Sequence, residues 1–179
     1  MPSVFSHPAV PLALTTALPP EMTSASVVVL GVACSVIPDL DVVGFRFGVP
    51  RGHVLSHRGL SHSIAFAVLL SACLAWLLPS AVSPSQGSRV IAFIFFCLST
   101  LSHGLLDAMT NGGSGVAFFA PLHNARYFLP WRPLLVSPIS VGRFFSGRGL
   151  DVLRSEWHWV WLPAAAMAVL LYSLRRLGS

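Results

Sequence analysis

Apolar residues gather in five stretches separated by polar segments, and this pattern predicts a bundle of membrane helices. The stretches are residues 8–18, 24–37, 60–78, 89–108 and 157–174. The third and fourth are long enough to span a bilayer, which takes about 20 residues, whereas the first two are shorter. Because Pro19 and Pro38 close the first two stretches, we expect them to form a helical hairpin packed against the longer helices.

The connection before the last stretch, residues 110–156, is long and rich in Gly, Pro and aromatic residues. These aromatic side chains suit a loop that lies on the membrane surface or over a site. The last stretch opens with Trp157, Trp159 and Trp161, which is typical of an aromatic belt at a membrane interface. The pattern predicts an all-α, polytopic membrane protein of about four to five apolar helices, with a long interfacial loop before the last helix.

Composition agrees with a membrane protein, since 54% of the 179 residues are hydrophobic and only 9% are charged. We expect one domain over residues 1–179. The net charge of +5 comes from arginine alone, and no basic run is interleaved with aromatics, so we expect no nucleic-acid partner. No Lys or Arg precedes the first apolar stretch, so we expect no cleavable signal peptide.

Candidate chemistry lies at the ends of the apolar stretches. Seven of the thirteen His, Asp and Glu residues fall there in four short clusters. They are His7, Asp39, Asp41, His57, His62, His103 and Asp107. Two up-down pairs of helices would bring all four clusters to one face of the membrane. Ionisable groups near hydrocarbon are costly and usually functional, so we predict a metal site there.

Two of the clusters contain carboxylates: one pairs a histidine with an aspartate, and the other consists of two aspartates. His103 and Asp107 are four residues apart and share one face of a helix, and imidazole with carboxylate suits zinc, manganese or iron. Asp39 and Asp41 follow Pro38 in a stretch that we expect to be extended, where alternate side chains share a side. The alternatives are a hydrogen-bonded helix end for the first cluster and a turn with solvated carboxylates for the second.

His57 and His62 are five residues apart, which does not place both rings on one face of a regular helix. We expect Gly59 to permit a turn and Ser61 to cap the helix that His62 enters, so that the two rings converge. The alternative is a pair of interfacial histidines. His7 is a candidate only through the hairpin, which returns it to the level of the two aspartates.

Four strings carry a family resemblance: PDLD at 38–41, HRGLSHS at 57–63, SHGLLDAMTNGG at 102–113 and ARYFLPWRPLLVSP at 125–138. Over nearly its whole length the chain resembles the bacterial inner-membrane, metal-dependent hydrolases of the DUF457 group, which includes the YdjM proteins. The resemblance implies a membrane-embedded metal site and hydrolase activity. The order of ligands is also similar, more faintly, to zinc-dependent phospholipase C and fungal single-strand nucleases, but the second HxxxD of those enzymes is missing here.

Seven ligands are enough for one or two divalent metal ions, most simply zinc, with manganese or iron as alternatives, and leave positions open for water and substrate. We therefore expect a hydrolase that acts on a phosphoester or lipid-linked substrate through water activated by the metal. Asp41 is the candidate bridging ligand and Arg58 a candidate catalytic residue. Arg58, Arg126 and Arg132 are candidates to bind phosphate, although each could instead serve the interface or stack on aromatics.

Two other functions remain open: a metal or proton transporter, and a non-catalytic protein whose metal only joins helices. Ligands at helix ends favour an interfacial enzyme, since transporters usually bind near the bilayer midplane. The expected partners are membrane lipids, and the sequence leaves the oligomeric state open. Eight arginines lie on the side of the site and three on the other, so we expect the site to face the cytoplasm from a multi-pass inner-membrane protein.

Overall fold

The computed structural model describes residues 1–77, 85–138, 142 and 144–177. In this part of the chain all regular structure is helical, which confirms the predicted all-α class. The elements are α1 (Ala9–Leu14), η1 (Thr15–Ala17), η2 (Pro20–Met22), α2 (Ala25–Val36), η3 (Ile37–Phe47), η4 (Leu60–His62), α3 (Ile64–Leu77), α4 (Gln86–Ala108), η5 (Phe144–Arg148), α6 (Gly149–Glu156), η6 (Trp157–Trp161) and α7 (Leu162–Leu177). Elements η1 to η4 are 3₁₀-helical, and η5 and η6 are π-helical.

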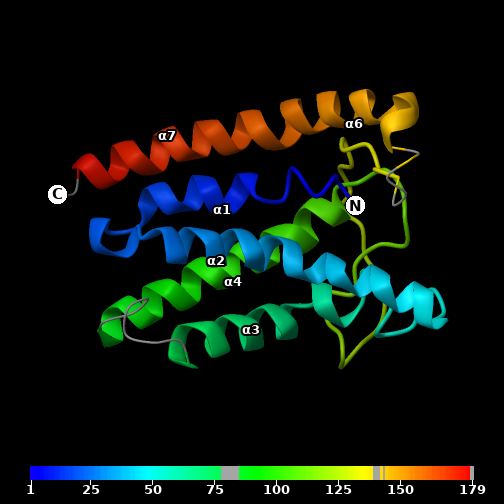
Figure 1. Ribbon diagram of the computed structural model, residues 1–179, viewed down its shortest axis with the longest axis horizontal. Coiled ribbons are helices and arrows are strands. Elements are labelled where there is room, and N and C mark those ends of the chain that lie inside the picture. The colour runs from blue at the N-terminus through cyan, green and yellow to red at the C-terminus, as the bar shows by residue number, and fades with distance from the viewer. Residues whose placement is uncertain (78–84, 139–141, 143, 178–179) are drawn as a thin grey trace.

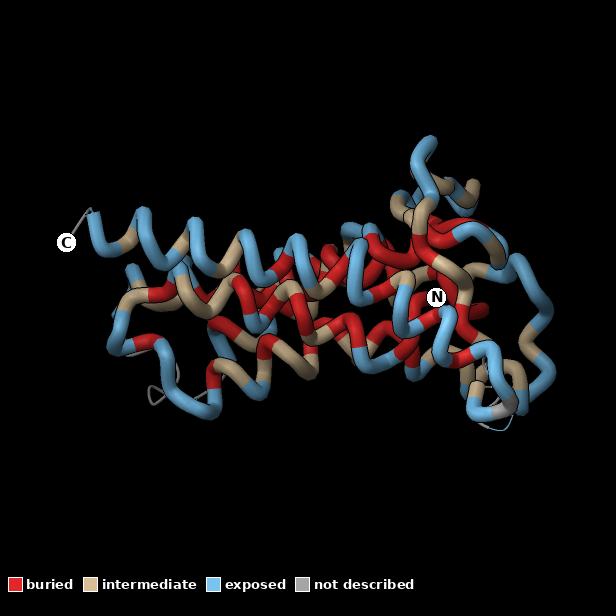
Figure 2. The backbone as a smooth tube through the Cα atoms, turned by 90° about the horizontal axis from the view of Figure 1, so that it is seen from above, coloured by how far each residue is buried: buried red, intermediate tan, exposed pale blue. Residues whose placement is uncertain are grey.

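The helices run roughly along one axis, with α4 between α2 and α3 and with α1 between α2 and α7 (Figure 1). Among the described residues, three helical segments are long and apolar enough to cross a membrane: Ala25–Phe47, Gln86–Ala108 and Gly149–Leu177. In the 18-residue apolar window of α4, 56% of the residues are buried, against only 11% in the window of the last segment, so α4 is central and α7 is peripheral. Figure 2 shows the mostly exposed helix that leads to the C-terminus. The exposed apolar face of α7 is the kind of surface that lipid covers.

The second α-helix ends next to Pro38, as predicted, but the chain does not become extended there. Helix α2 ends at Val36 and continues directly into η3, and the joined segment is long enough to span, which was not predicted. Proline removes one N–H donor, and it is tolerated at the first turn of a new helix, where that donor has no partner. Asp39 and Asp41 are consequently 3₁₀-helical rather than extended.

The third helix is shorter than expected, and the last is longer. Helix α3 begins at Ile64, after η4, and within the described chain it runs for only 14 residues. The last helical segment begins at Gly149 rather than at Trp157, so the interfacial loop ends earlier than predicted. The polar turn expected at 79–88 lies mostly outside the described residues, but Ser85 caps α4 by accepting a hydrogen bond from the Ser88 N–H.

Small residues allow the central helices to approach closely, as membrane helices do. A Cβ atom at Gly31 of α2 would lie 2.4 Å from the Phe95 ring of α4, so any larger residue would displace that ring. Fully buried Cys34, Ala75 and Ala92 belong to the same apolar cluster. This packing fixes α2, α3 and α4 against one another and so fixes the ends of these helices, where the candidate ligands lie.

Candidate metal centre

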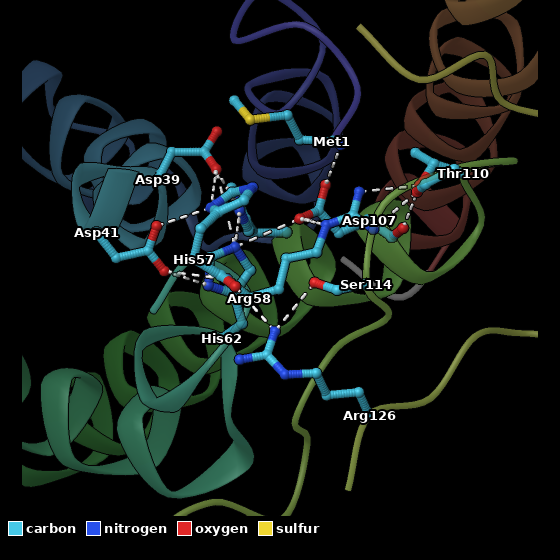
Figure 3. Close-up of polar contacts among 12 residues, drawn as sticks. Met1, Asp39, Asp41, His57, Arg58, His62, Asp107, Thr110, Ser114 and Arg126 are labelled. Atoms are coloured by element: carbon cyan, nitrogen blue, oxygen red, sulfur yellow. Dashed lines mark hydrogen bonds and ion pairs between the residues drawn. The ribbon is translucent and has the colours of Figure 1, made fainter. Parts of the chain in front are cut away.

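All seven candidate ligand residues lie together at one end of the bundle. Figure 3 shows Asp39, Asp41, His57, His62 and Asp107 among them. They come from the segment before α1 (His7), η3 (Asp39 and Asp41), the loop before η4 (His57), η4 itself (His62) and the last turns of α4 (His103 and Asp107). The structure confirms the prediction that the four clusters lie next to one another. This arrangement follows from the up-and-down course of the helices, which returns the chain to the same end after α2 and again after α4.

The deepest part of the centre is a group of two carboxylates and two imidazoles, here called the inner group: Asp39, His62, His103 and Asp107. One ligand atom from each lies within 4.8 Å of the other three, and all four residues are buried. The Nε2 atoms of His62 and His103 are 3.0 Å apart, and Asp107 Oδ2 is 3.3 Å from His62 Nε2. Ligands bound at about 2.0–2.1 Å to a tetrahedral zinc ion lie roughly 3.4 Å from one another, so the inner group fits a shared metal ion.

Asp39 is surrounded by imidazoles. Its oxygens lie 3.3 Å from a ring nitrogen of His103, 3.8 Å from His62, 3.8 Å from His7 and 3.9 Å from His57. Four buried atoms make no hydrogen bond within the described chain. They are the two carboxylate oxygens of Asp39 and the two ring nitrogens of His7. Buried polar atoms almost always have a partner, so these atoms form a group that could hold a cation or a water molecule.

His7 is held against the inner group from the far end of the sequence. Its ring stacks on His103, with centroids 3.8 Å apart and planes 20° apart. Burial, helped by the nearby His103, lowers the pKa of His7 to about 3, so the ring is neutral and its lone pair is available to a metal ion. Fully buried Glu156 fixes the preceding segment by accepting hydrogen bonds from Ser3 Oγ at 2.6 Å, Ser6 Oγ at 2.7 Å and the Ser3 N–H.

A second group, here called the outer group, consists of Asp41, His57 and His62. Asp41 Oδ1 lies 2.7 Å from His57 Nδ1, and Asp41 Oδ2 lies 3.2 Å from His62 Nδ1. Ser61 Oγ donates a further hydrogen bond of 2.6 Å to Oδ2, and the Arg58 N–H donates one of 3.2 Å. Carboxylates that hold metal-binding histidines in this way fix the orientation of the rings. In contrast to Asp39, Asp41 therefore has both oxygens occupied.

His62 belongs to both groups, because its two ring nitrogens face in opposite directions. Burial opposes a charge on this ring, but the contacts with Asp107, Asp39 and Asp41 outweigh burial and raise the pKa of His62 to about 10. Three carboxylates around one imidazole thus favour positive charge at this point.

The turn between the two histidines differs from the prediction in detail. Arg58, not Gly59, has the left-handed conformation, with φ of 66°. Gly59 is required for space, because a Cβ atom there would lie 2.1 Å from the Val54 carbonyl oxygen. Ser63 rather than Ser61 caps the following helix, accepting a hydrogen bond from the Phe66 N–H, while the Ser61 hydroxyl is directed at the outer group.

The three candidate phosphate-binding arginines are all engaged within the protein. Arg58 is buried, with Nε 3.0 Å from Asp107 Oδ2 and hydrogen bonds to Thr110 and the Gly112 carbonyl, so it holds Asp107 in place. The Arg132 guanidinium lies 4.8 Å from the ring centroid of Phe128. Arg126 joins the loop before η4 to the long loop, through the carbonyls of His53 and His57 and the hydroxyls of Ser56 and Ser114.

A cavity of about 640 Å³ adjoins the centre. Its wall includes Met1, His57 and Arg58, and the Met1 amino nitrogen lies 3.7 Å from Asp107 Oδ1. Exposed Arg51 also lines this cavity, although it was not among the arginines predicted to bind phosphate. The only signal for Arg51 was its place in the glycine- and proline-containing turn that precedes the histidine motif.

Fold and centre together define a class: a helical membrane protein with a buried histidine and aspartate cluster that could hold a metal ion at the end of its spanning helices. The chain belongs to the YdjM inner membrane protein family, whose model matches residues 1–177. It is 34% identical over 176 residues to the inner membrane protein YbcI of Escherichia coli, covering 98% of this chain and 100% of that protein. No solved structure matches the chain. Membership of this family places the protein in the inner membrane.

Proposed function

We propose that this protein is a metal-dependent hydrolase that acts on a phosphoester or lipid-linked substrate at the membrane interface. One observation carries the proposal: the inner group, with ligand atoms spaced as around one ion, lies directly behind the wall of a cavity of about 640 Å³. Met1 and Arg58 of that wall contact Asp107, and His57 of the same wall lies 3.9 Å from Asp39. A cavity of this volume is within the range that small-molecule sites occupy, about 300–1,000 Å³.

Each part of the centre has a role in this proposal. The inner group and His7 would hold the metal, most simply zinc, with manganese or iron as alternatives. A metal bound there would supply Lewis acidity and lower the pKa of a bound water. His57 lines the cavity and contacts Asp41, so it is placed to accept or donate a proton there. Arg51 is placed to bind a phosphate from the cavity wall.

The number of ions is part of the same proposal. Ligand atoms of the outer group also lie within 4.8 Å of one another, so this group offers a second position. The occupied oxygens of Asp41 favour a different role, in which Asp41 orients His57 and His62 around a single ion. The proposal therefore places one firmly bound ion in the inner group.

Transport is the second candidate function. It is less well supported, because His103 and Asp107 lie in the last turns of α4, and His7, His57 and His62 lie outside the spanning segments. Only Asp39 and Asp41 lie on a helix that changes geometry within a span, which is where transporters usually bind. A purely structural metal would leave the neighbouring cavity and Arg51 without a role. Transport predicts movement of metal into sealed proteoliposomes, whereas hydrolysis does not.

The test combines metal analysis with a substrate screen. Protein purified in detergent without chelator is expected to contain zinc, manganese or iron, and to hydrolyse at least one member of a panel of phosphodiesters and phospholipids in a chelator-sensitive way. Asp39→Asn and His103→Ala should abolish both properties. Asp151→Asn and His123→Ala are matched controls, since both residues are exposed and outside the centre. Metal content unchanged by Asp39→Asn and His103→Ala together would overturn the proposal.

A further inference from the structure

A second, apolar cavity of about 260 Å³ lies beside the cavity of the metal centre. Val4 and Phe5 form one wall of this cavity, Val42 of η3 forms another, and Phe144 and Phe145 of η5 form a third. The ring centroids of Phe5 and Phe144 are 6.2 Å apart, and those of Phe144 and Phe145 are 5.4 Å apart. Phe5 is 57% exposed and Phe145 is 76% exposed, so the aromatic wall is open to the surroundings.

The two cavities are neighbours, because Met1 and Ser137 line both of them. One holds Arg51, His57 and Arg58, and the other is lined mainly by apolar side chains. A polar cavity with a metal centre next to an apolar one matches a molecule with a charged head and a hydrocarbon tail. Both cavities lie at the end of the membrane-spanning segments, where the head groups and the first part of the chains of lipids lie.

We propose that the apolar cavity binds one hydrocarbon chain of a membrane phospholipid whose phosphate enters the polar cavity. This inference rests on the proposed function, since it assigns a substrate class to the same centre. Chain binding at this position would hold the phosphoester near the metal centre. Each buried methylene adds binding free energy, so a chain in this cavity would favour lipid over free phosphoester.

The experiment uses the full chain in nanodiscs of phosphatidylethanolamine and phosphatidylglycerol. The probe is a phosphatidylglycerol with a photoreactive diazirine at the end of one acyl chain, and mass spectrometry locates the labelled peptides. We expect labelling of Val4–Phe5 or Phe144–Phe145 to exceed labelling of Val169–Leu170, which are exposed lipid-facing residues of α7. Equal labelling of these sites would mean contact with bulk lipid only and would overturn the inference.

Val4→Trp fills the cavity and should lower its labelling by about tenfold, which corresponds to displacing roughly two buried methylenes. Val169→Trp is the matched control and should leave that labelling unchanged. Val42→Phe fills the cavity from the opposite wall, and retained metal content will show that its neighbour Asp41 is undisturbed. Labelling that neither filling variant reduces would contradict the inference.

Labelling does not require turnover, so the two proposals can fail separately. Specific labelling without hydrolysis of any substrate would contradict the proposed function but would still support the apolar cavity as a binding site for a hydrocarbon chain. Chelator-sensitive hydrolysis without specific labelling would contradict only the cavity assignment. If both hold, Val4→Trp should raise KM for the long-chain lipid about tenfold and leave a short-chain analogue unaffected.

Discussion

At the scale of single residues, the two aspartates of η3 have different surroundings although only Leu40 separates them. Asp39 faces four imidazoles and makes no hydrogen bond within the described chain, whereas Asp41 is fully engaged by Ser61, His57 and a backbone N–H. Lone pairs that no protein donor occupies remain available to a metal ion. The structure thus favours Asp39 as a ligand and Asp41 as the residue that orients the rings.

Substitution of these two aspartates should separate the roles. Asp39→Asn removes a ligand and is expected to leave no tightly bound metal, whereas Asp41→Asn should weaken metal binding by about 10–100-fold, as loss of an orienting carboxylate does. Competition with a fluorescent chelator measures both affinities. If Asp41→Asn abolished binding and Asp39→Asn did not, the assignments would have to be exchanged.

Gly59 offers a second prediction at this scale, because its neighbour is backbone and cannot move aside easily. Gly59→Ala should destabilise the protein by about 1–3 kcal/mol through overpacking against the Val54 carbonyl. Gly87→Ala, in the first turn of α4, meets only the Ser85 hydroxyl at 3.9 Å and should be neutral or slightly stabilising. Thermal unfolding in detergent compares the two variants, and equal melting temperatures would contradict the argument.

At the scale of elements, the sequence was informative wherever contacts follow from helix periodicity and chain direction. The i,i+4 pair of His103 and Asp107 does lie on one buried face of α4, and the helix ends do meet. Pro38 was misleading, because a local rule for breaking α-helices does not distinguish a stop from a change to 3₁₀ geometry. The contacts of Glu156 were not predictable, because its partners are 150 and 153 residues away.

Glu156 joins the start of the last spanning segment to the segment that carries His7. Glu156→Ala leaves the Ser3 and Ser6 donors buried without partners, which costs about 1–3 kcal/mol for an unsatisfied group. We expect amide hydrogen exchange over residues 3–9 to become about tenfold faster or more, with weaker metal binding as a result. Glu21→Ala is the control, since Glu21 is exposed in η2. Unchanged exchange over residues 3–9 would show that His7 is held by other contacts.

At the scale of the whole molecule, the class and the place of the centre could be predicted because hydropathy sets the spans and the spans set which helix ends meet. Which residues bind the metal and which only orient the ligands could not be predicted. Asp39 and Asp41 are chemically identical and differ only in the neighbours that folding brings to them. Likewise, the sequence does not show which arginines are engaged within the protein and which line the cavity. Arg58 and Arg126 are engaged by loop backbone and by Asp107, whereas Arg51 faces the cavity.

Orientation in the membrane is the remaining property of the whole molecule, and the fold makes it testable from one end of the chain. The N-terminus lies at the end of the bundle that carries the centre, and α7 runs to the opposite end (Figure 1). Of the ten arginines among the described residues, seven lie on the side of the centre and three, Arg89, Arg175 and Arg176, on the other. Arg58 is buried and paired with Asp107, but six against three still favours a cytoplasmic centre under the positive-inside rule.

We therefore expect alkaline phosphatase fused after the last residue to be active and a green fluorescent protein fused there to be dark, as for a periplasmic C-terminus. Leu122→Cys supplies the complementary measurement, because Leu122 is 95% exposed in the long loop at the end that carries the centre. In intact cells this cysteine should resist a membrane-impermeant maleimide and react only after the inner membrane is opened. The reverse pattern for both reporters would place the centre in the periplasm, and its substrates would then come from the outer leaflet.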